Sequence, residues 1–200
     1  MTPNRRGTLL VAVWIATLCC VPVVQAVGQD STIGRPTAIL VTGPREGEEA
    51  PDFSLPWASK DTVGGAQWFS LSAQRGKIVV LAFYPKDFTP GCTAEMRTFT
   101  EQYPDLFGND VVVVGISPDS LSTHQRFAGS LGLPFHLLSD LDQKVSRAYG
   151  SADRGGYNRR TVYVIDRKGR VSYADLRFGA LDPKAYANLK SAIRDARRGA

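Results

Sequence analysis

Cysteine is scarce in this sequence of 200 residues. Only three cysteines occur, and two of them, Cys19 and Cys20, lie in an apolar N-terminal run. The sequence has no Cys-x-x-Cys pair and no cluster of Cys and His at zinc-ligand spacing. If export removes the N-terminal run, Cys92 remains alone and has no partner for an internal disulfide. This pattern excludes a disulfide framework, a zinc finger and a dithiol redox motif.

Motifs for cofactors are also missing. The sequence contains no glycine-rich phosphate loop and no haem-attachment motif, so we expect neither a cofactor nor a metal. Basic residues exceed acidic ones by 24 to 19, and Arg5 and Arg6 lie in the segment that export would remove. The remaining charge is small and dispersed, which is typical of a solvated surface, so we expect no nucleic-acid partner.

The N-terminus has the pattern of a secretory signal peptide. Arg5 and Arg6 precede an almost uncharged apolar run from Leu9 to Val21, and the small residues before Ala26 offer a cleavage site. We therefore expect residues 1–26 to be removed and the protein to be periplasmic or secreted. The alternative is an uncleaved segment that tethers the chain to a membrane.

The rest of the chain divides into a tether and one domain. Residues 27–49 are rich in Gly, Pro and Thr, and this composition predicts a flexible tether. Residues 50–200 contain regular apolar segments without an internal repeat, and they are long enough to bury a core of their own. The sequence therefore predicts a single globular domain from residue 50 onward.

Apolar segments alternate with capped helical segments along this domain. A hairpin is expected over residues 53–71. Further strands are expected at 78–84, 110–117, 135–138, 160–166 and 170–174. Helices are expected at 92–103, from Ser120 or Ser122 to 131, from Asp140 or Asp142 to 149, and from 182 onward. This order predicts a three-layer α/β/α sandwich with a central mixed sheet and an N-terminal β-hairpin, which is the order of a thioredoxin-like fold.

Cys92 stands where a strand is expected to meet a helix. The β-branched run from Ile78 to Tyr84 ends at Pro85, and a polar turn then leads to Cys92 at the helix start. The partial positive charge of a helix N-terminus favours thiolate over thiol, and thiolate is the reactive form. The alternative is a buried cysteine with no chemical role.

The sequence around Cys92 resembles the active-site motif of the peroxiredoxins. That motif is Pro-x-x-x-Thr-x-x-Cys, and FYPKDFTPGCTAE at residues 83–95 matches it with Pro85, Thr89 and Cys92. The wording is most similar to the bacterioferritin-comigratory or Q-type branch. Four further segments fit the family in order and at its spacing: APDFSL at 50–55, GISPDS at 115–120, LPFHLLSD at 133–140 and RTVYVID at 160–166.

Each motif residue has a task that peroxide reduction requires. Cys92 is the candidate nucleophile, which becomes a sulfenic acid when its thiolate attacks the O–O bond. Thr89 can direct its hydroxyl at the sulfur or the peroxide, and Pro85, which has no N–H, can shield the pocket from water. Backbone N–H groups at Gly91 and Cys92 can receive charge that develops on the peroxide oxygens.

The resemblance also implies an arginine that stabilises the thiolate. Alignment through YVID places it at Arg160, and Arg159 is the neighbour that could be confused with it. Period-2 alternation sends these two side chains to opposite faces of a strand, so only one can serve. Lys86 and Glu95 are candidates for supporting this site, and Glu95, one helical turn beyond Cys92, can brace the arginine.

The sequence departs from the branch it resembles at one position. Many Q-type members have a resolving cysteine five residues after the first, where this chain has Arg97, and no later cysteine occurs. We therefore expect a one-Cys peroxidase that reduces hydrogen peroxide and organic hydroperoxides and depends on an external thiol, either a thioredoxin-like protein or a small thiol. The protein would be a monomer or homodimer.

Two other functions remain open at this point. One is a thioredoxin-fold redox sensor or binding module without turnover. The other is an exported thiol–disulfide oxidoreductase, which the missing Cys-x-x-Cys argues against. His124 and His136 have no partners at ligand or triad spacing, so structural roles are expected for both.

Overall fold

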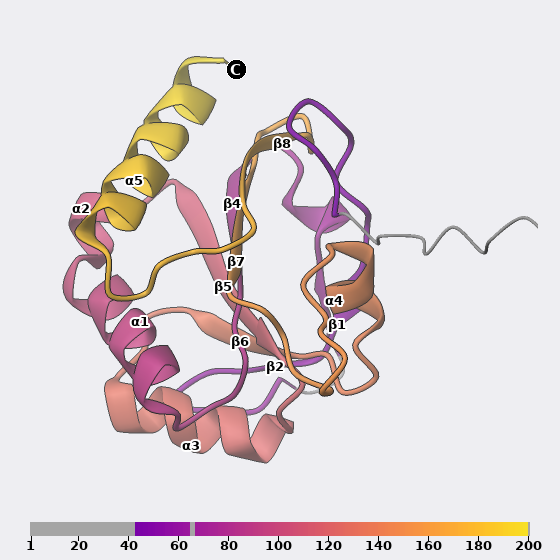
Figure 1. The fold of residues 1–200 in the computed structure, drawn as a ribbon, viewed down its shortest axis with the longest axis vertical. Helices are drawn as coiled ribbons and strands as arrows, with labels where there is room; N and C mark the ends of the chain where they lie inside the picture. The colour runs from indigo at the N-terminus through magenta and orange to yellow at the C-terminus, as the bar shows by residue number, and fades with distance from the viewer. Residues whose placement is uncertain (1–42, 65–66, 200) are drawn as a thin grey trace, which may run out of the picture. The chain divides into compact units, whose positions relative to one another are not determined.

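The computed structural model describes residues 43–64 and 67–199 (Figure 1). The expected signal peptide at 1–26, its cleavage site at Ala26 and residues 27–42 of the expected tether lie outside the described residues. Among the described residues, no helix combines the length and the apolar character that a membrane crossing requires.

A six-stranded mixed sheet forms the centre of the domain, as expected. Its strands follow the order β2-β6-β5-β4-β7-β8. They are β2 (Trp57–Ala58), β4 (Ile78–Phe83), β5 (Val111–Ser117), β6 (His136–Ser139), β7 (Thr161–Ile165) and β8 (Val171–Asp175). β4, β5 and β6 run parallel, whereas β2, β7 and β8 pair antiparallel to their neighbours. The uniformly apolar β4 and β5 lie in the middle of this sheet, where both faces are covered.

Five α-helices accompany the strands in the described part of the chain. They are α1 (Pro90–Glu101), α2 (Tyr103–Leu106), α3 (Leu121–Leu131), α4 (Lys144–Ala148) and α5 (Pro183–Arg198), with a 3₁₀ turn η1 at Ser72–Gln74. Ser120 caps α3 by accepting from the Thr123 N–H, and Asp182 caps α5 by accepting from the Lys184 N–H. The helix expected at 92–103 starts earlier, at Pro90, because proline suits the first turn of a helix. It also ends earlier, and Pro104 lies in the first turn of the separate helix α2.

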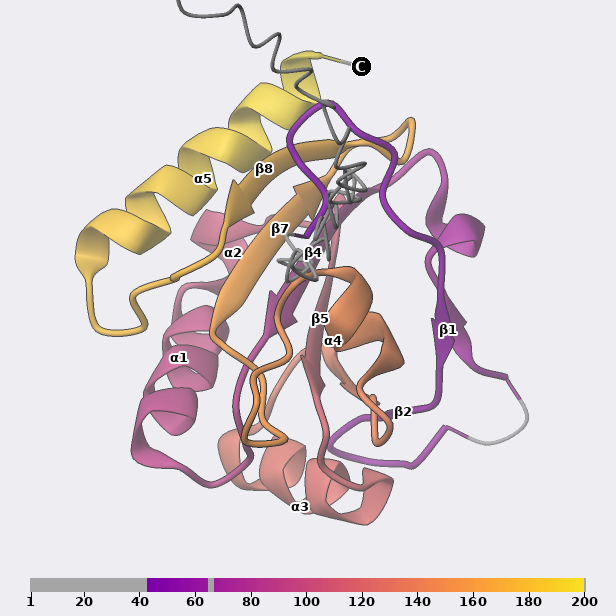
Figure 2. The same ribbon diagram turned by 45° about the vertical axis from the view of Figure 1, so that its right-hand side comes forward.

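The two faces of the sheet carry separate cores. Along β4, Ile78, Val80 and Ala82 pack in one cluster with residues of α1, α3 and α5. Val79 and Leu81 point the other way, into a cluster with the N-terminal hairpin and α4. Figures 1 and 2 show the same division: α1, α2, α3 and α5 on one side of the sheet, and α4 with β1 on the other. The second outer layer thus combines one short helix with a hairpin.

The N-terminal hairpin forms, with a detour. β1 (Ser54–Leu55) pairs antiparallel with β3 (Phe69–Ser70), so the expected pairing within residues 53–71 is confirmed. Between them the chain leaves the hairpin, and β2 joins the edge of the central sheet beside β6. Residues 43–49, the described end of the expected tether, lie against the β7–β8 hairpin: the Gly47 N–H donates to the Val171 carbonyl. Packing onto the domain therefore starts a few residues before Ala50.

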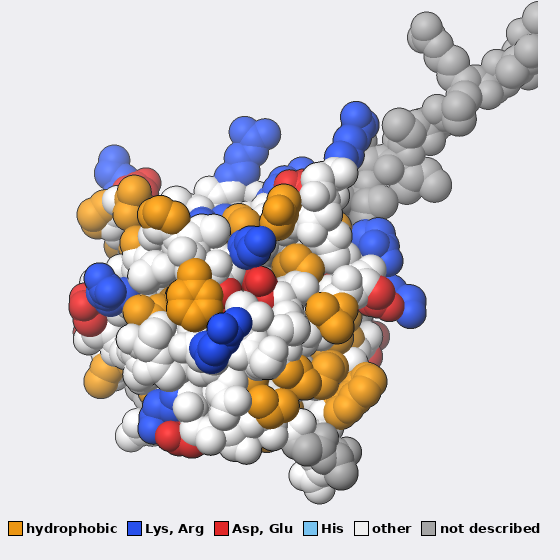
Figure 3. Space-filling model, turned by 90° about the horizontal axis from the view of Figure 1, so that it is seen from below, with side chains coloured by type: hydrophobic (Ala, Val, Ile, Leu, Met, Phe, Trp, Pro, Cys, Tyr) orange, Lys and Arg blue, Asp and Glu red, His pale blue; other side chains and the backbone are white. Residues whose placement is uncertain are grey.

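The face of the domain in Figure 3 mixes side-chain types. Apolar side chains form several groups, and basic side chains are scattered singly between them without a continuous basic stripe. Some large apolar side chains of the domain are well exposed, among them Phe88 and Tyr157. Both lie in loops, and Phe88 belongs to the loop that leads to Cys92.

Candidate active site

Cys92 lies in the first turn of α1, at the end of a loop that leaves the central strand β4. Thr89 occupies the N-cap position in extended conformation, and its carbonyl accepts the first helical hydrogen bond, from the Thr93 N–H. Cys92 is the third residue of the helix and is fully buried. The helix N-terminus therefore places its partial positive charge at this sulfur, as the sequence predicted.

Sheet register brings Arg160 to the same place. β7 pairs antiparallel with β4 so that Thr161 lies opposite Phe83, and the residue before Thr161 therefore lies beside the loop that starts after β4. The guanidinium of Arg160 reaches over α1, where Nη2 donates to Cys92 Sγ at 3.5 Å. Nη1 donates to Oε2 of Glu95, which is fully buried. The structure thus joins Cys92, Glu95 and Arg160 in one cluster.

Arg159 points elsewhere. Its side chain is exposed, and Nη2 donates to the backbone carbonyl of Gly150. Because neighbouring side chains of a strand alternate between its faces, only one of the two arginines can reach the sulfur. The contacts show that this residue is Arg160.

The electrostatics of the cluster are dominated by burial. Burial raises the pKa of the Glu95 carboxyl from its ordinary 4.5 to about 7, and attraction by Arg160 offsets only part of that rise. Oε1 of Glu95 has no hydrogen-bond partner among the described residues, so no donor at that oxygen offsets the cost of burying the carboxylate. For Arg160, burial lowers the pKa, but the charges of Glu95 and Cys92 raise it by more, so the net pKa lies above the ordinary value.

Thr89 is oriented by the loop and not by the helix. Thr89 occupies the N-cap position with its backbone, but its side chain makes no capping hydrogen bond to α1. Instead, Oγ1 donates to the Lys86 carbonyl at 2.9 Å. With its proton used in this way, the hydroxyl oxygen can only accept a hydrogen bond from a molecule that binds beside it.

Pro85 and Lys86 complete the loop. Pro85 is half-buried where β4 ends, and Lys86 is exposed. The Lys86 ammonium lies over the Tyr157 ring, 5.9 Å from its centroid, so this side chain faces the loop before β7. Pro85 therefore belongs to the loop that leads to Cys92, and Lys86 contributes its backbone carbonyl to that loop.

No pattern in the sequence connects Asp87 with His124, but the structure brings their side chains together. His124 Nδ1 lies 2.8 Å from Asp87 Oδ2, and both side chains are buried. Asp87 stands between exposed Lys86 and exposed Phe88, so no periodic pattern marks it as an inward-facing residue. The only sequence feature that could have pointed to Asp87 is its position inside the motif at residues 83–95.

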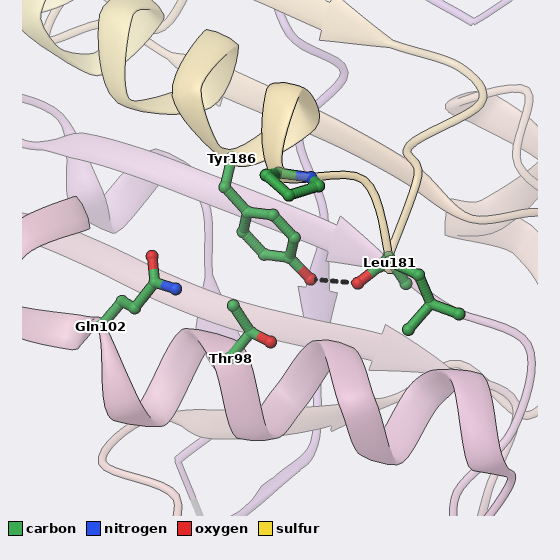
Figure 4. Close-up of a pocket in the computed structure, with 6 residues that line it drawn as sticks. Thr98, Gln102, Leu181 and Tyr186 are labelled. Atoms are coloured by element: carbon green, nitrogen blue, oxygen red, sulfur yellow. Dashed lines mark hydrogen bonds between the residues drawn. The ribbon is translucent and has the colours of Figure 1, made fainter.

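A shallow pocket of about 310 Å³ lies further along α1. It is lined by Thr98, Gln102, Ala180, Leu181, Pro183 and Tyr186 (Figure 4). The Tyr186 hydroxyl donates to the Ala180 carbonyl at 2.7 Å and so ties the segment before α5 to the first turn of α5. The pocket does not include Cys92. The residues that the structure describes also contain no group of three or more Cys, His, Asp and Glu suited to a metal ion.

Comparison with known proteins adds four similarities. Residues 47–174 match the AhpC/TSA family. Peroxiredoxin Bcp of Bacillus subtilis (strain 168) is 37% identical over 133 residues, which is 62% of this chain and 80% of the relative. Chloroplastic peroxiredoxin Q of Triticum aestivum is 39% identical over 139 residues, 68% of this chain and 61% of the relative. The crystal structure of peroxidoxin BcpB from Mycobacterium tuberculosis, 28% identical, matches with a TM-score of 0.64 over 76% of this chain and 97% of its own.

Proposed function

Because the chain belongs to the AhpC/TSA family and is a thiol-dependent peroxidase of the peroxiredoxin type, we propose that Cys92 is the residue that reduces the peroxide. The resemblance read from the motif at residues 83–95 is thereby confirmed. The observation that carries the assignment to Cys92 is the guanidinium of Arg160, 3.5 Å from its sulfur, at the N-terminus of α1. A cation and a helix terminus together stabilise negative charge on the sulfur.

The first step is a displacement at oxygen. The Cys92 thiolate attacks one oxygen of the peroxide, so that an S–O bond forms while the O–O bond breaks. The sulfur is oxidised to a sulfenic acid, and the other oxygen leaves with the electron pair and takes up a proton to become water or an alcohol. Arg160 offsets the charge that moves from the sulfur to the departing oxygen.

Thr89 and the helix start hold the peroxide for this attack. The Thr89 hydroxyl donates to the Lys86 carbonyl, so its oxygen accepts from the O–H of the bound peroxide. Gly91 and Cys92 belong to the first turn of α1, whose N–H groups have no partner within the helix and can donate to the peroxide oxygens. Pro85 contributes no N–H and keeps water from the sulfur.

The second half of the cycle requires a thiol from outside the chain. Cys92 is the one free cysteine in the described part of the structure, and Arg97 stands exposed one turn along α1, at the position five residues after it. An external thiol attacks the sulfenic sulfur, which releases water and leaves a mixed disulfide. A second thiol then attacks the mixed disulfide and restores Cys92.

Mass spectrometry of the mature chain tests this cycle. One equivalent of hydrogen peroxide should add one oxygen to wild-type protein, and added glutathione should convert that product to a mixed disulfide. Peroxide consumption with glutathione or thioredoxin as reductant should be lost in Cys92→Ser, whose fold is checked by circular dichroism. Equal consumption by both proteins would contradict the role of Cys92. Oxidation without turnover under any thiol would instead indicate a redox sensor.

We also propose that the protein is exported through a signal peptide that is cleaved near Ala26. The charged start, apolar run and small residues of that segment support the proposal. Fractionation of the source cell and N-terminal sequencing would test it, with a mature chain that starts at Val27 as the expected result. A full-length chain in the membrane fraction would instead support an uncleaved tether.

A further inference from the structure

The loop between β4 and α1 contains a residue that is buried although its neighbours are exposed. Asp87 is 3% exposed. Its Oδ1 accepts from the Tyr84 hydroxyl at 2.7 Å, and its Oδ2 lies 2.8 Å from His124 Nδ1. A buried carboxylate with two polar partners is costly to displace, because leaving either partner unpaired in the core exacts a desolvation penalty.

His124 connects this loop to the rest of the sheet. The ring is fully buried on α3, and its Nε2 lies 3.2 Å from the Leu138 carbonyl on β6. The pair of Asp87 and His124 therefore joins three elements that are far apart in the sequence: the loop after β4, helix α3 and strand β6. No step proposed for peroxide reduction uses either side chain.

The backbone of Asp87 is held as well. Its N–H donates to Asp119 Oδ2 at 2.8 Å, and the same carboxylate oxygen accepts from the Ser117 hydroxyl at 2.7 Å. The N–H of Asp87 and the carbonyl of Lys86 belong to one planar peptide group, so fixing one fixes the direction of the other. That carbonyl is the acceptor of the Thr89 hydroxyl.

The next residue shows that this loop needs such restraint. Phe88 has a φ of 59°, in the left-handed region that residues other than Gly adopt only at an energetic cost. Its ring is half exposed but packs on Phe127 of α3, with ring centroids 5.0 Å apart. A strained residue persists only where its surroundings fix it, and Asp87 and Phe88 are both fixed by α3.

We propose that Asp119 and the Asp87–His124 pair are positioning residues that fix the peptide between Lys86 and Asp87 and thereby aim the Thr89 hydroxyl at the peroxide. The inference rests on the proposed role of Thr89 in holding the substrate. If the peptide rotates, the carbonyl no longer accepts the Thr89 proton. The hydroxyl then becomes free to donate, and its oxygen loses the orientation that receives the O–H of the peroxide.

Comparing two reactions of the Cys92 sulfur, one with peroxide and one with an alkylating agent, distinguishes a positioning role from a general loss of structure at the site. Peroxide needs the Thr89 hydroxyl, whereas alkylation by iodoacetamide needs only the thiolate. We expect Asp119→Ala to lower the second-order rate constant for hydrogen peroxide about tenfold to a hundredfold while the alkylation rate stays within about twofold. Asp119→Asn, which keeps an acceptor oxygen, should recover most of the peroxide rate. A parallel fall of both rates in Asp119→Ala would overturn the inference.

A double-mutant cycle tests whether the effect passes through Thr89. Thr89→Val should itself slow the peroxide reaction, and Asp119→Ala should then add no further loss. Losses that multiply in the double variant would overturn the inference and leave the role of Thr89 intact. An unchanged peroxide rate in Thr89→Val would overturn both the role of Thr89 and the inference built on it. Activity that does not depend on Cys92 would refute the proposed function itself.

Folding controls keep the result interpretable. Asp166→Ala is the matched control for Asp119→Ala, because both aspartates are half-buried and accept backbone N–H groups. Asp166 accepts those of Lys168 and Arg170, at a turn far from the site. It should leave the ratio of peroxide rate to alkylation rate unchanged. If Asp119→Ala does not fold, Asp87→Asn takes its place, since it retains the shape of the side chain. Unfolding midpoints are measured for each variant, and a lowered ratio in Asp166→Ala would overturn the inference.

Discussion

At the scale of single residues, one guanidinium serves two acceptors. Arg160 donates through one nitrogen to Cys92 Sγ and through the other to the Glu95 carboxyl. The planar fork of arginine can do this with one orientation, whereas the ammonium of lysine acts as a single point charge. Glu95 therefore aims the cation at the sulfur, and Arg160 offsets part of the cost of burying Glu95.

Arg160→Lys should consequently lose most of its peroxidase activity although it keeps the charge. We expect the kcat/KM for peroxide to fall about a hundredfold, because a point charge that remains with Glu95 no longer lies against the sulfur. Steady-state peroxide consumption measures the effect. Arg159→Lys is the control on the same segment, and an equal loss in that variant would contradict the assignment.

Glu95 should give the fold a pH dependence of its own. Its pKa in the folded protein, about 7, lies above the ordinary 4.5, so the folded state binds this proton more tightly than the unfolded chain does. The stabilisation from Glu95 is complete below about pH 4.5 and is lost as the pH rises through about 7, which corresponds to about 3 kcal/mol. Urea unfolding between pH 5 and 8 should show this decline in wild type and a flatter profile in Glu95→Gln. Identical slopes in the two proteins would argue against it.

At the scale of elements, local signals were sufficient where neighbours along the chain decide the structure. The β-branched apolar run at 78–84 predicted the strand β4, and Ser120 was one of two predicted caps for α3. The detour of the N-terminal hairpin through β2 was not predictable, because it depends on pairing with β6, which lies far along the chain. The contact of Asp87 with His124 has the same origin, since it joins residues 37 positions apart.

The cap of α3 can be tested directly. Ser120 accepts from the Thr123 N–H, so Ser120→Ala should lower the free energy of unfolding by about 1 kcal/mol. Ser122, the other residue predicted as a cap, already lies inside the helix, and Ser122→Ala should change stability by a few tenths of a kcal/mol at most. Urea denaturation of both variants decides between them. A larger loss in Ser122→Ala would mean that α3 begins later than described.

At the scale of the whole molecule, the sheet separates two cores that do not share side chains. One contains Ile193 of α5, and the other contains Ile165 of β7. Both residues are almost fully buried, so each depends on close packing within its own cluster. The mixed sheet and its two coverings were predictable from the alternation of strands and helices. The composition of the second covering, one short helix with a hairpin, was not.

Substitutions in the two cores should therefore add. Ile193→Val and Ile165→Val should each cost about 0.5–1.5 kcal/mol, and the double variant should lose the sum to within about 0.5 kcal/mol. All three should still unfold in one cooperative transition, because both cores rest on the same central strands. Chemical denaturation followed by fluorescence and by circular dichroism tests both points. A second transition, or a strong departure from additivity, would contradict this division of the core.

The partnership of Cys92 with Arg160 also has a consequence in time. The two residues are 68 positions apart, and at roughly 5–20 residues per second a ribosome completes the cysteine several seconds before it reaches the arginine. Until β7 pairs with β4, the nascent or translocating chain carries a thiol that lacks its cation. The reactive sulfur is thus completed only after Arg160 is in place, and a chain that is still being made or moved presents a poor target to the oxidants that the finished protein consumes.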